Sequence, residues 1–248
     1  MLGTYGDGGN GAVLAARAAW RGIPVDLLLV SSDAPLPSGA DLYCLGGGED
    51  GPQARSAELL RGGALPAAVS RGATVLAVCA GFQIVGTSFA GPDGTTVPGV
   101  GLVDATTARG TGPRAVGEVV LESVEHATRD GGLSIGSGEL VTGFENHAGV
   151  TRLGPGLAPL GLVRSGTGNG AGAPGRPEGA VSGHVVCTYL HGPVLARNPA
   201  LADRLVAAAT GAAPEPLDDS EELLLRAECL ARAARPRRLR AGRLLRIR

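Results

Sequence analysis

The sequence predicts an α/β fold with a largely parallel central sheet covered by helices. Along the first third of the 248-residue chain, short apolar segments alternate with helical segments, and small or glycine-rich turns follow two of the apolar segments. This alternation favours a parallel sheet, because parallel neighbours need a long crossover connection. The chain is long enough to bury one large domain, or one domain and an appendage.

The first expected element is a helix that Asn10 caps and that ends near Arg21, where Gly22 follows. The next elements are a strand, a second strand, a helix and a third strand, expected at Pro24–Val30, Leu42–Leu45, Pro52–Arg61 and Thr74–Val78. A continuous apolar run such as the last is typical of a strand that is buried on both faces.

Beyond about residue 95 the pattern favours strands, followed by a closing helix. The strands are expected at Gly117–Ser123, Glu139–Phe144, Leu157–Val163 and Ala180–Leu190, and the helix at about Asn198–Ala209. The glycine-rich stretch Ser165–Pro177 is expected to be a loop. Prolines at positions 214 and 216 divide the chain into a domain over residues 1–212 and an arginine-rich tail over residues 213–248.

All 22 basic residues are arginine, which excludes a lysine-containing phosphate-binding loop and lysine Schiff-base chemistry. Residues 225–248 hold nine arginines and one glutamate, a net charge of +8, whereas the rest of the chain is acidic. Such a tail can bind nucleic acid, an anionic membrane surface or an acidic partner. A solvated tail, or one folded against the acidic body, is the simpler interpretation, and we expect no nucleic acid partner.

Neither secretion nor a membrane span is indicated. No apolar run reaches about 18 residues, and no basic segment followed by an apolar one stands at the N-terminus. The four cysteines are dispersed without a C-x-x-C pair, which favours a reducing compartment. We therefore expect a cytoplasmic protein in which Cys44, Cys187 and Cys229 act as small buried hydrophobes.

Cys79 differs from these three because it stands at the turn between a buried strand and a helix. The stretch T-V-L-A-V-C-A-G-F-Q, residues 74–83, places small residues on both sides of it. A nucleophile on such a turn needs small neighbours, and the following helix N-terminus favours a thiolate. The backbone N–H of Ala80 would point towards a developing oxyanion. A core cysteine is the competing interpretation.

A second glycine-rich turn, G-G-G-E-D at residues 46–50, falls at the same expected edge of the sheet. Neighbouring strands would bring the amides of Gly47 and Gly48 towards Cys79 as further oxyanion donors. A cysteine nucleophile also needs a base, and His191, which closes V-V-C-T-Y-L, stands modestly ahead of His147, which closes G-F-E-N-H. No closely spaced ligand pair predicts a metal site.

Four motifs taken together, C-L-G-G-G-E-D, A-V-C-A-G-F-Q, G-F-E-N-H-A-G and T-Y-L-H-G-P, resemble those of the class I glutamine amidotransferases in their cobyric-acid-synthase-like branch. A narrower resemblance, to the glutaminase subunits of lipid II isoglutaminyl synthases, rests on Y-G-D-G-G-N, P-R-A-V-G-E and G-T-G-N-G. It covers residues 1 to about 211. The combination is specific, and it implies a class I glutamine amidotransferase-like fold.

The resemblance implies hydrolysis of glutamine to glutamate and ammonia, with Cys79 as nucleophile and His191 as the proton-transfer group. It also implies that Arg114 binds the α-carboxylate of glutamine and that Gln83 lines the same pocket. A Mur-ligase-like partner would use the ammonia to amidate D-glutamate in the peptidoglycan stem peptide of lipid II. This chain would need no cofactor, since ATP and magnesium would bind to the partner.

Two features depart from the family pattern. Pro193 stands where amidotransferases carry the glutamate of the catalytic triad, so a third member would come from elsewhere, such as the partner, or be missing. Relatives also carry a strand ahead of Y-G-D-G-G-N, which Met1–Thr4 is too short to form, so we expect the first strand of the sheet to be missing. Alternative functions are an amidotransferase for a cobyrinic-acid-type substrate, a catalytically silent scaffold subunit, and a Cys/His hydrolase of another amide.

Overall fold

The structure is a computed structural model that describes residues 6–31, 34–61, 63–126, 133, 136–170 and 175–234. Its central sheet has the strand order β1-β2-β12-β11, in which the first three strands are parallel and β11 is antiparallel to β12. In that order the strands span Leu42–Leu45, Thr74–Val78, Val185–Thr188 and Ala180–Ser182. The expected largely parallel central sheet is confirmed.

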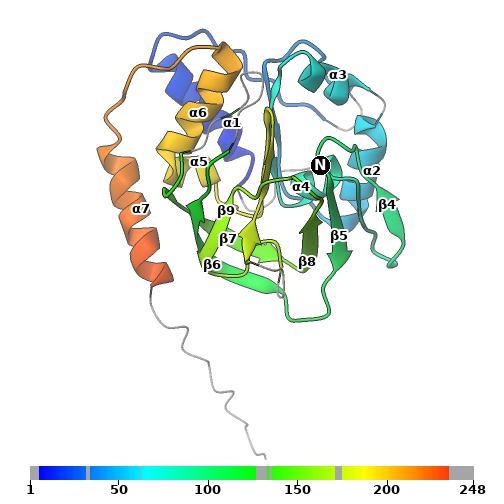
Figure 1. The fold of residues 1–248 in the computed structure, drawn as a ribbon. Coiled ribbons are helices and arrows are strands. Elements are labelled where there is room, and N and C mark those ends of the chain that lie inside the picture. The colour runs from blue at the N-terminus through cyan, green and yellow to red at the C-terminus, as the bar shows by residue number, and fades with distance from the viewer. Residues whose placement is uncertain are drawn as a thin grey trace, which may run out of the picture.

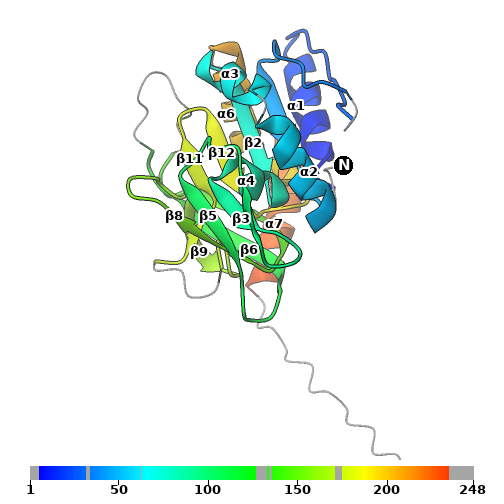
Figure 2. The ribbon, with the colours of Figure 1, turned by 90° about the vertical axis from the view of Figure 1, so that its right-hand side faces the viewer.

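Helices cover both faces of this sheet (Figures 1 and 2). In Figure 1 the helices α1 and α6 lie on one side of the sheet and α2 and α3 on the other, while α4 follows directly from β2. The helices span Gly9–Ala19 (α1), Asp50–Leu60 (α2), Ala64–Ser70 (α3), Ala80–Val85 (α4), Val194–Arg197 (α5), Pro199–Thr210 (α6) and Ser220–Ala233 (α7).

Two further four-stranded sheets form the lower part of the molecule in Figure 1. One is antiparallel with the order β10-β9-β6-β7, and its strands in that order span Pro177–Glu178, Gly161–Ser165, Ala115–Ser123 and Leu140–His147. The other has the order β4-β3-β5-β8, with strands at Thr96–Pro98, Ser88–Ala90, Ala105–Arg109 and Gly149–Leu153. The strand expected at Ala180–Leu190 is a hairpin of β11 and β12.

The capping role predicted for Asn10 is wrong. Asn10 is the second residue of α1 and is buried, and no side chain caps this helix. Its Oδ1 instead accepts a hydrogen bond of 3.1 Å from the backbone N–H of Leu195 in α5. Asn10 therefore ties α1 to the segment that follows β12, which a capping motif read from the local sequence alone could not reveal.

The strand predicted over Pro24–Val30 is also wrong. This segment pairs with no described strand, and its apolar residues are exposed, up to 90% at Leu29. A cavity of about 830 Å³ is lined by this segment, by α1 and by β1. An apolar run can form a strand only where a neighbouring edge supplies its hydrogen bonds, and here the cavity lies beside β1. The missing first strand that we expected concerns residues 1–5, which lie outside the described residues.

Two cysteines occupy the core and one does not. Cys187 and Cys229 are buried as expected. Cys44 is exposed because its side chain lies on the wall of the 830 Å³ cavity, so the core role predicted for it is wrong.

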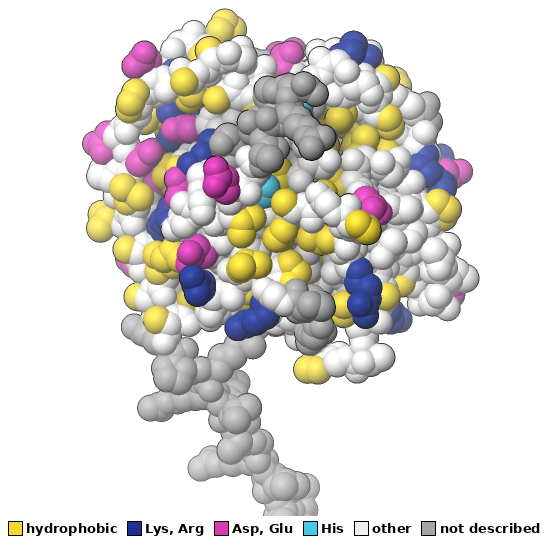
Figure 3. Space-filling view, in the orientation of Figure 1, with side chains coloured by type: hydrophobic (Ala, Val, Ile, Leu, Met, Phe, Trp, Pro, Cys, Tyr) yellow, Lys and Arg dark blue, Asp and Glu magenta, His cyan; other side chains and the backbone are white. Residues whose placement is uncertain are grey.

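The expected tail contains α7, which packs against β6, β7 and α5. Its first turn contacts Arg17 of α1, a buried arginine whose Nη1 donates to Asp219 at 2.7 Å and whose Nε donates to Asp203 at 2.7 Å. These carboxylates satisfy a charge that would be costly to bury alone. On the face seen in Figure 3, arginines gather along the lower part and acidic side chains lie mostly at the left. Most of the tail's arginines, at positions 235–248, lie outside the described residues.

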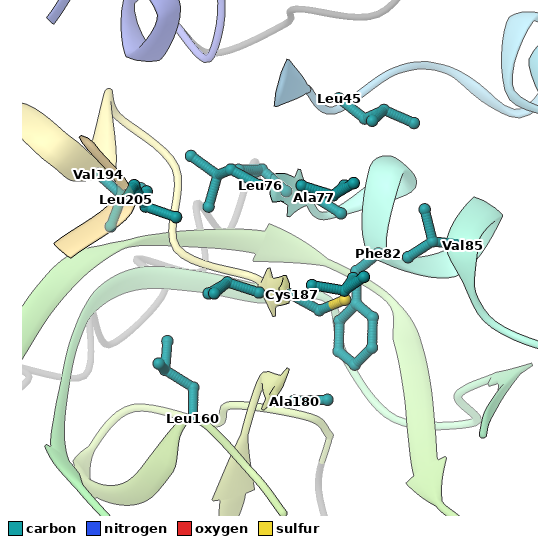
Figure 4. Close-up of a cluster of buried hydrophobic side chains, with 14 of the residues drawn as sticks. Leu45, Leu76, Ala77, Phe82, Val85, Leu160, Ala180, Cys187, Val194 and Leu205 are labelled. Carbon is teal, nitrogen blue, oxygen red and sulfur yellow. The ribbon is translucent and has the colours of Figure 1, made fainter. Parts of the chain in front are cut away.

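The main core lies around the central sheet and is built from small and aliphatic side chains (Figure 4). Leu76 and Ala77 of β2, Cys187 of β12 and Phe82 of α4 are all completely buried there. This packing fixes the strand that precedes Cys79 and the helix that follows it, and so it fixes the turn between them.

The difference in burial between Leu76 and Leu29 predicts that their alanine variants differ strongly in the free energy of unfolding. Replacing Leu76 by alanine should lower the free energy of unfolding by about 2–5 kcal/mol, since it opens a cavity in the buried sheet. Leu29→Ala should change it by less than about 0.5 kcal/mol, because that side chain is already in solvent. Urea unfolding of both variants measures the difference, and similar losses would show that the Pro24–Val30 segment is packed in solution.

Candidate active site

Cys79 occupies a strained turn between β2 and α4. Its φ of 53° and ψ of −104° are rare for a residue with a side chain, and α4 begins at the next residue. The Cys79 N–H donates to the carbonyl of Thr188 on β12 at 2.8 Å, which helps to hold this conformation. A side chain at Gly81 would place its Cβ 2.4 Å from the carbonyl oxygen of Leu45, so glycine allows α4 to approach β1. Strain held in this way is typical of a nucleophile turn.

His191 lies three residues beyond the end of β12, and its backbone is fixed by β7. Its N–H donates to the carbonyl of Phe144 at 2.8 Å, and its own carbonyl accepts from Phe144 in return. The imidazole is completely buried and interacts with the side chain of Cys79. The structure therefore brings together the cysteine and the histidine that the sequence favoured.

The third group of this arrangement is Asp7, immediately ahead of α1. Its side chain and that of His191 are both fully buried, and the Nδ1 of His191 donates to Oδ2 of Asp7 at 2.8 Å. Asp7 is a functional residue that no sequence pattern singled out. The pair is separated by 184 residues, and the only local signal was the aspartate in Y-G-D-G-G-N.

The surroundings of His191 set its charge. Burial lowers its pKa, but the hydrogen bonds to Asp7 and Cys79 and the negative charge of both groups outweigh this and raise the pKa to about 9. At neutral pH the imidazolium form is therefore favoured, and it can stabilise negative charge on the Cys79 sulfur.

The amides expected to form the oxyanion site have different surroundings. The N–H of Gly47 donates to Oδ2 of Asp7 at 2.8 Å, so it braces the glycine-rich turn instead of facing the reacting carbonyl. This differs from the direct donor role predicted for Gly47. Gly48 and Ala80 line a cavity together with Cys79. These two residues remain the candidates for the oxyanion site.

That cavity has a volume of about 150 Å³ and contains the residues expected to bind substrate. It is lined by Arg114 and Gln83, as well as by three polar residues that the sequence did not suggest for this role, namely Gln53, Thr107 and Arg109. Several of these residues come from α2 and β5, and motif spacing gave no indication that those elements reach the same cavity as Cys79.

Arg114 and Gln83 are both held by specific hydrogen bonds. The Nε of Arg114 donates to the side chain of Asn146, and its Nη2 donates to the carbonyl of Asn146 at 2.8 Å. Gln83 accepts from Gln53 at 2.7 Å and donates to the hydroxyl of Tyr189 at 3.2 Å. Side chains oriented in this way lose little further freedom when a ligand binds.

His147, the other candidate base, also lines the cavity. It stacks on Tyr189 with ring centres 3.9 Å apart, and its Nδ1 lies 3.0 Å from the carbonyl of Gly149. Burial lowers its pKa to about 4, so it is neutral at physiological pH. No carboxylate is hydrogen-bonded to His147 among the described residues, whereas His191 carries Asp7. The geometry favours His191 as the base.

Over the part of the chain that the structure describes, no group of three or more His, Cys, Asp or Glu side chains could hold a metal ion. Within the same ranges, no helix is long and apolar enough to cross a membrane.

An α/β sheet with a cysteine on a strained strand-to-helix turn and a histidine beside it defines the active site of an enzyme that uses a cysteine nucleophile. The family model for the CobB/CobQ-like glutamine amidotransferase domain matches residues 3–199, and the chain belongs to this family. It is a glutamine amidotransferase. A solved structure titled "Crystal structure of glutamine amidotransferase" aligns with 80% of this chain and 93% of its own at a TM-score of 0.52 and 18% identity, which supports the fold.

Curated relatives extend the similarity. The chain is 31% identical over 96% of its length to the "Lipid II isoglutaminyl synthase (glutamine-hydrolyzing) subunit GatD" of Staphylococcus aureus, covering 95% of that protein. The subunit of the same name from Streptococcus pneumoniae is 32% identical over 84% of this chain and 76% of its own length. A cobyric acid synthase of Rhodobacter capsulatus is 33% identical over 68% of this chain, but over 32% of its own length.

The buried carboxyl group of Glu178 should make the stability of the protein depend on pH. Glu178 of β10 is completely buried and accepts from the N–H of Tyr189 at 2.6 Å and from the hydroxyl of Thr188 at 2.9 Å. Burial raises its pKa from 4.5 to about 7. The native protein therefore holds this proton more tightly than the unfolded chain, and stability should fall as pH rises from about 4.5 to about 7.

Glu178→Gln should abolish this contribution, which is on the order of 3 kcal/mol. The free energy of unfolding in urea, measured at several pH values, should decline more steeply for the wild type than for the variant across that window. Titrating groups that do not interact with Glu178 are common to both proteins and cancel in the difference. Parallel curves would contradict the raised pKa of Glu178.

Proposed function

We propose that this chain is the glutaminase subunit of a lipid II isoglutaminyl synthase. It hydrolyses glutamine, and a Mur-ligase-like partner uses the released ammonia to amidate D-glutamate in the peptidoglycan stem peptide. The observation that carries this proposal is the similarity to the Staphylococcus aureus subunit, which extends over nearly the whole of both chains.

The proposed mechanism uses Cys79 as nucleophile and His191 as acid and base. The Cys79 sulfur attacks the side-chain carboxamide carbon while its proton resides on His191, and amides at Gly48 and Ala80 hold the oxyanion. His191 gives the proton to the departing amine, which leaves as ammonia. A water molecule then attacks the thioester as His191 takes its proton, glutamate leaves, and the proton returns to the sulfur of Cys79.

Substrate recognition is assigned to two other residues that line the 150 Å³ cavity, Arg114 and Gln83. The guanidinium of Arg114 would bind the α-carboxylate of glutamine, because it has N–H groups beyond the two that Asn146 occupies. Gln83 would contact the substrate from α4.

The acceptor chemistry is assigned to the partner. Capture of ammonia requires an activated carboxylate, and we propose that the partner supplies it with ATP and magnesium and also binds lipid II. We place the reaction in the cytoplasm, where glutamine and ATP are both present. We favour this function over that of a cobyrinic-acid-type synthase because the similarity to the Staphylococcus aureus subunit extends over 96% of this chain, whereas the similarity to the Rhodobacter capsulatus cobyric acid synthase extends over 68%. The buried Cys79 and His191 pair argues against a silent scaffold.

The direct test is glutamate release from glutamine by the purified chain, alone and with the Mur-ligase-like partner. Cys79→Ala and His191→Gln should each abolish release. His184→Gln is the matched control, because its carbonyl bonds the N–H of Val75 at the opposite end of β2 from Cys79. With the partner, ATP and lipid II present, amidated lipid II should accumulate. Glutaminase activity without lipid II amidation would favour another acceptor.

Arg114→Ala should raise the KM for glutamine by about 10–100-fold and change kcat less, because a charged hydrogen bond to the α-carboxylate contributes equally in the ground and transition states. Arg164→Ala is the control, since Arg164 is an exposed arginine that pairs with Glu122. Steady-state kinetics separate the two parameters. An unchanged KM would remove Arg114 from the substrate site.

A further inference from the structure

We propose that Asp7 is the positioning residue for His191, so that a complete Cys79, His191 and Asp7 triad is contained within this chain. The inference builds on the glutaminase chemistry proposed above. Pro193 stands where amidotransferases carry the glutamate of the triad, and the proposal assigns the role of that glutamate to Asp7.

The geometry of the hydrogen bond carries the proposal. His191 and Asp7 are both fully buried, and Nδ1 of His191 lies 2.8 Å from Oδ2 of Asp7. A carboxylate that accepts the Nδ1 proton fixes the ring orientation and tautomer, which leaves Nε2 to serve the nucleophile. His191 interacts with Cys79 at the same time. The three groups therefore form one connected chain.

The fold explains how an acid from the N-terminal side can take this role. A side chain at Gly9 would place its Cβ 2.7 Å from the ring of Pro193, so the start of α1 lies directly against the residue that replaces the usual glutamate. The bond between Asn10 and Leu195 holds α1 to α5 on the far side of Pro193. Asp7, just ahead of α1, thus supplies the carboxylate for His191 that the side chain of Pro193 cannot supply.

A purely structural role for Asp7 is the competing interpretation, because Oδ2 also accepts the N–H of Gly47 at 2.8 Å. That role needs only a hydrogen-bond acceptor, which an asparagine oxygen would supply. The other oxygen, Oδ1, is buried and has no hydrogen-bond partner among the described residues. A charged carboxylate in that position is costly to bury, and asparagine would be less so. The test must therefore remove the negative charge of Asp7 and keep a hydrogen-bond acceptor at that position.

Other charged and titratable groups around His191 are few. Cys79 faces it from the start of α4, and His147, at the end of β7, is close enough for the His191 charge to lower its pKa. The guanidinium of Arg197 in α5 lies near Gly192 and is paired with Glu118 at 2.6 Å. Asp7 is the carboxylate bonded directly to the ring, so its removal should weaken the imidazolium form of His191.

The experiment compares the full-length wild type with Asp7→Asn. Iodoacetamide labels Cys79 in the absence of glutamine, and peptide mass spectrometry follows the labelling rate against pH. The Asp7→Asn rate at Cys79 should fall about tenfold near neutral pH, and its profile should move to higher pH by about one unit. The glutaminase kcat should fall at least about 100-fold, with a smaller change in KM.

Asp203→Asn is the matched control, because it removes a carboxylate partner of the buried Arg17 and Asp203 does not line the cavity that contains Cys79. It should lower stability and leave the labelling profile of Cys79 unchanged. A wild-type profile in Asp7→Asn would overturn the proposal, and so would recovery of the wild-type profile on adding the partner, which would place the third acid there. Because labelling needs no glutamine, these results stand even where the chain fails to release glutamate.

Discussion

One buried carboxylate, that of Asp7, joins three segments that are distant in the sequence. Its Oδ2 accepts from His191, which follows β12, and from Gly47, which follows β1, while Asp7 itself leads into α1. All three segments meet at the carboxyl edge of a parallel sheet, where successive strands of this kind of fold deliver their loops. The position of the imidazole and the shape of the glycine-rich turn therefore depend on the same atom. A shift of α1 would disturb both.

The nucleophile depends on a different set of constraints. Cys79 keeps its strained backbone because β12 accepts its N–H and because Gly81 lets α4 pack closely on β1. Strain of this kind costs about 1–3 kcal/mol and persists only where packing on all sides overdetermines it. The completely buried Leu76, Ala77 and Phe82 supply that packing. The backbone conformation of Cys79 therefore depends on the packing of the hydrophobic core.

The sequence predicted the parallel sheet, the turn at Cys79 and the position of His191 near the end of a strand, because each depends on local composition or on apolar periodicity. It could not predict features that depend on long-range contacts. Asn10 has the residue type of a cap but bonds to Leu195, and Pro24–Val30 has the pattern of a strand but no neighbouring edge. The partnership of Asp7 with His191 is of the same kind, since only the folded chain places α1 beside the end of β12.

The location of Asp7 also ties catalysis to the large cavity beside α1 and β1. Asp7 lies on the wall of the 830 Å³ cavity that α1, β1 and the exposed Pro24–Val30 segment share. Asp7 connects the segments after β12 and β1 by accepting hydrogen bonds from His191 and Gly47. Both bonds are charge-assisted, and such bonds are stronger than neutral ones. The side chains of Asp7 and His191 are both shielded from water, which strengthens the hydrogen bond between them. This bond therefore depends on the burial of both side chains. The position of Asp7 just ahead of α1 is thus a condition for the charge on His191, and through it for the reactivity of Cys79.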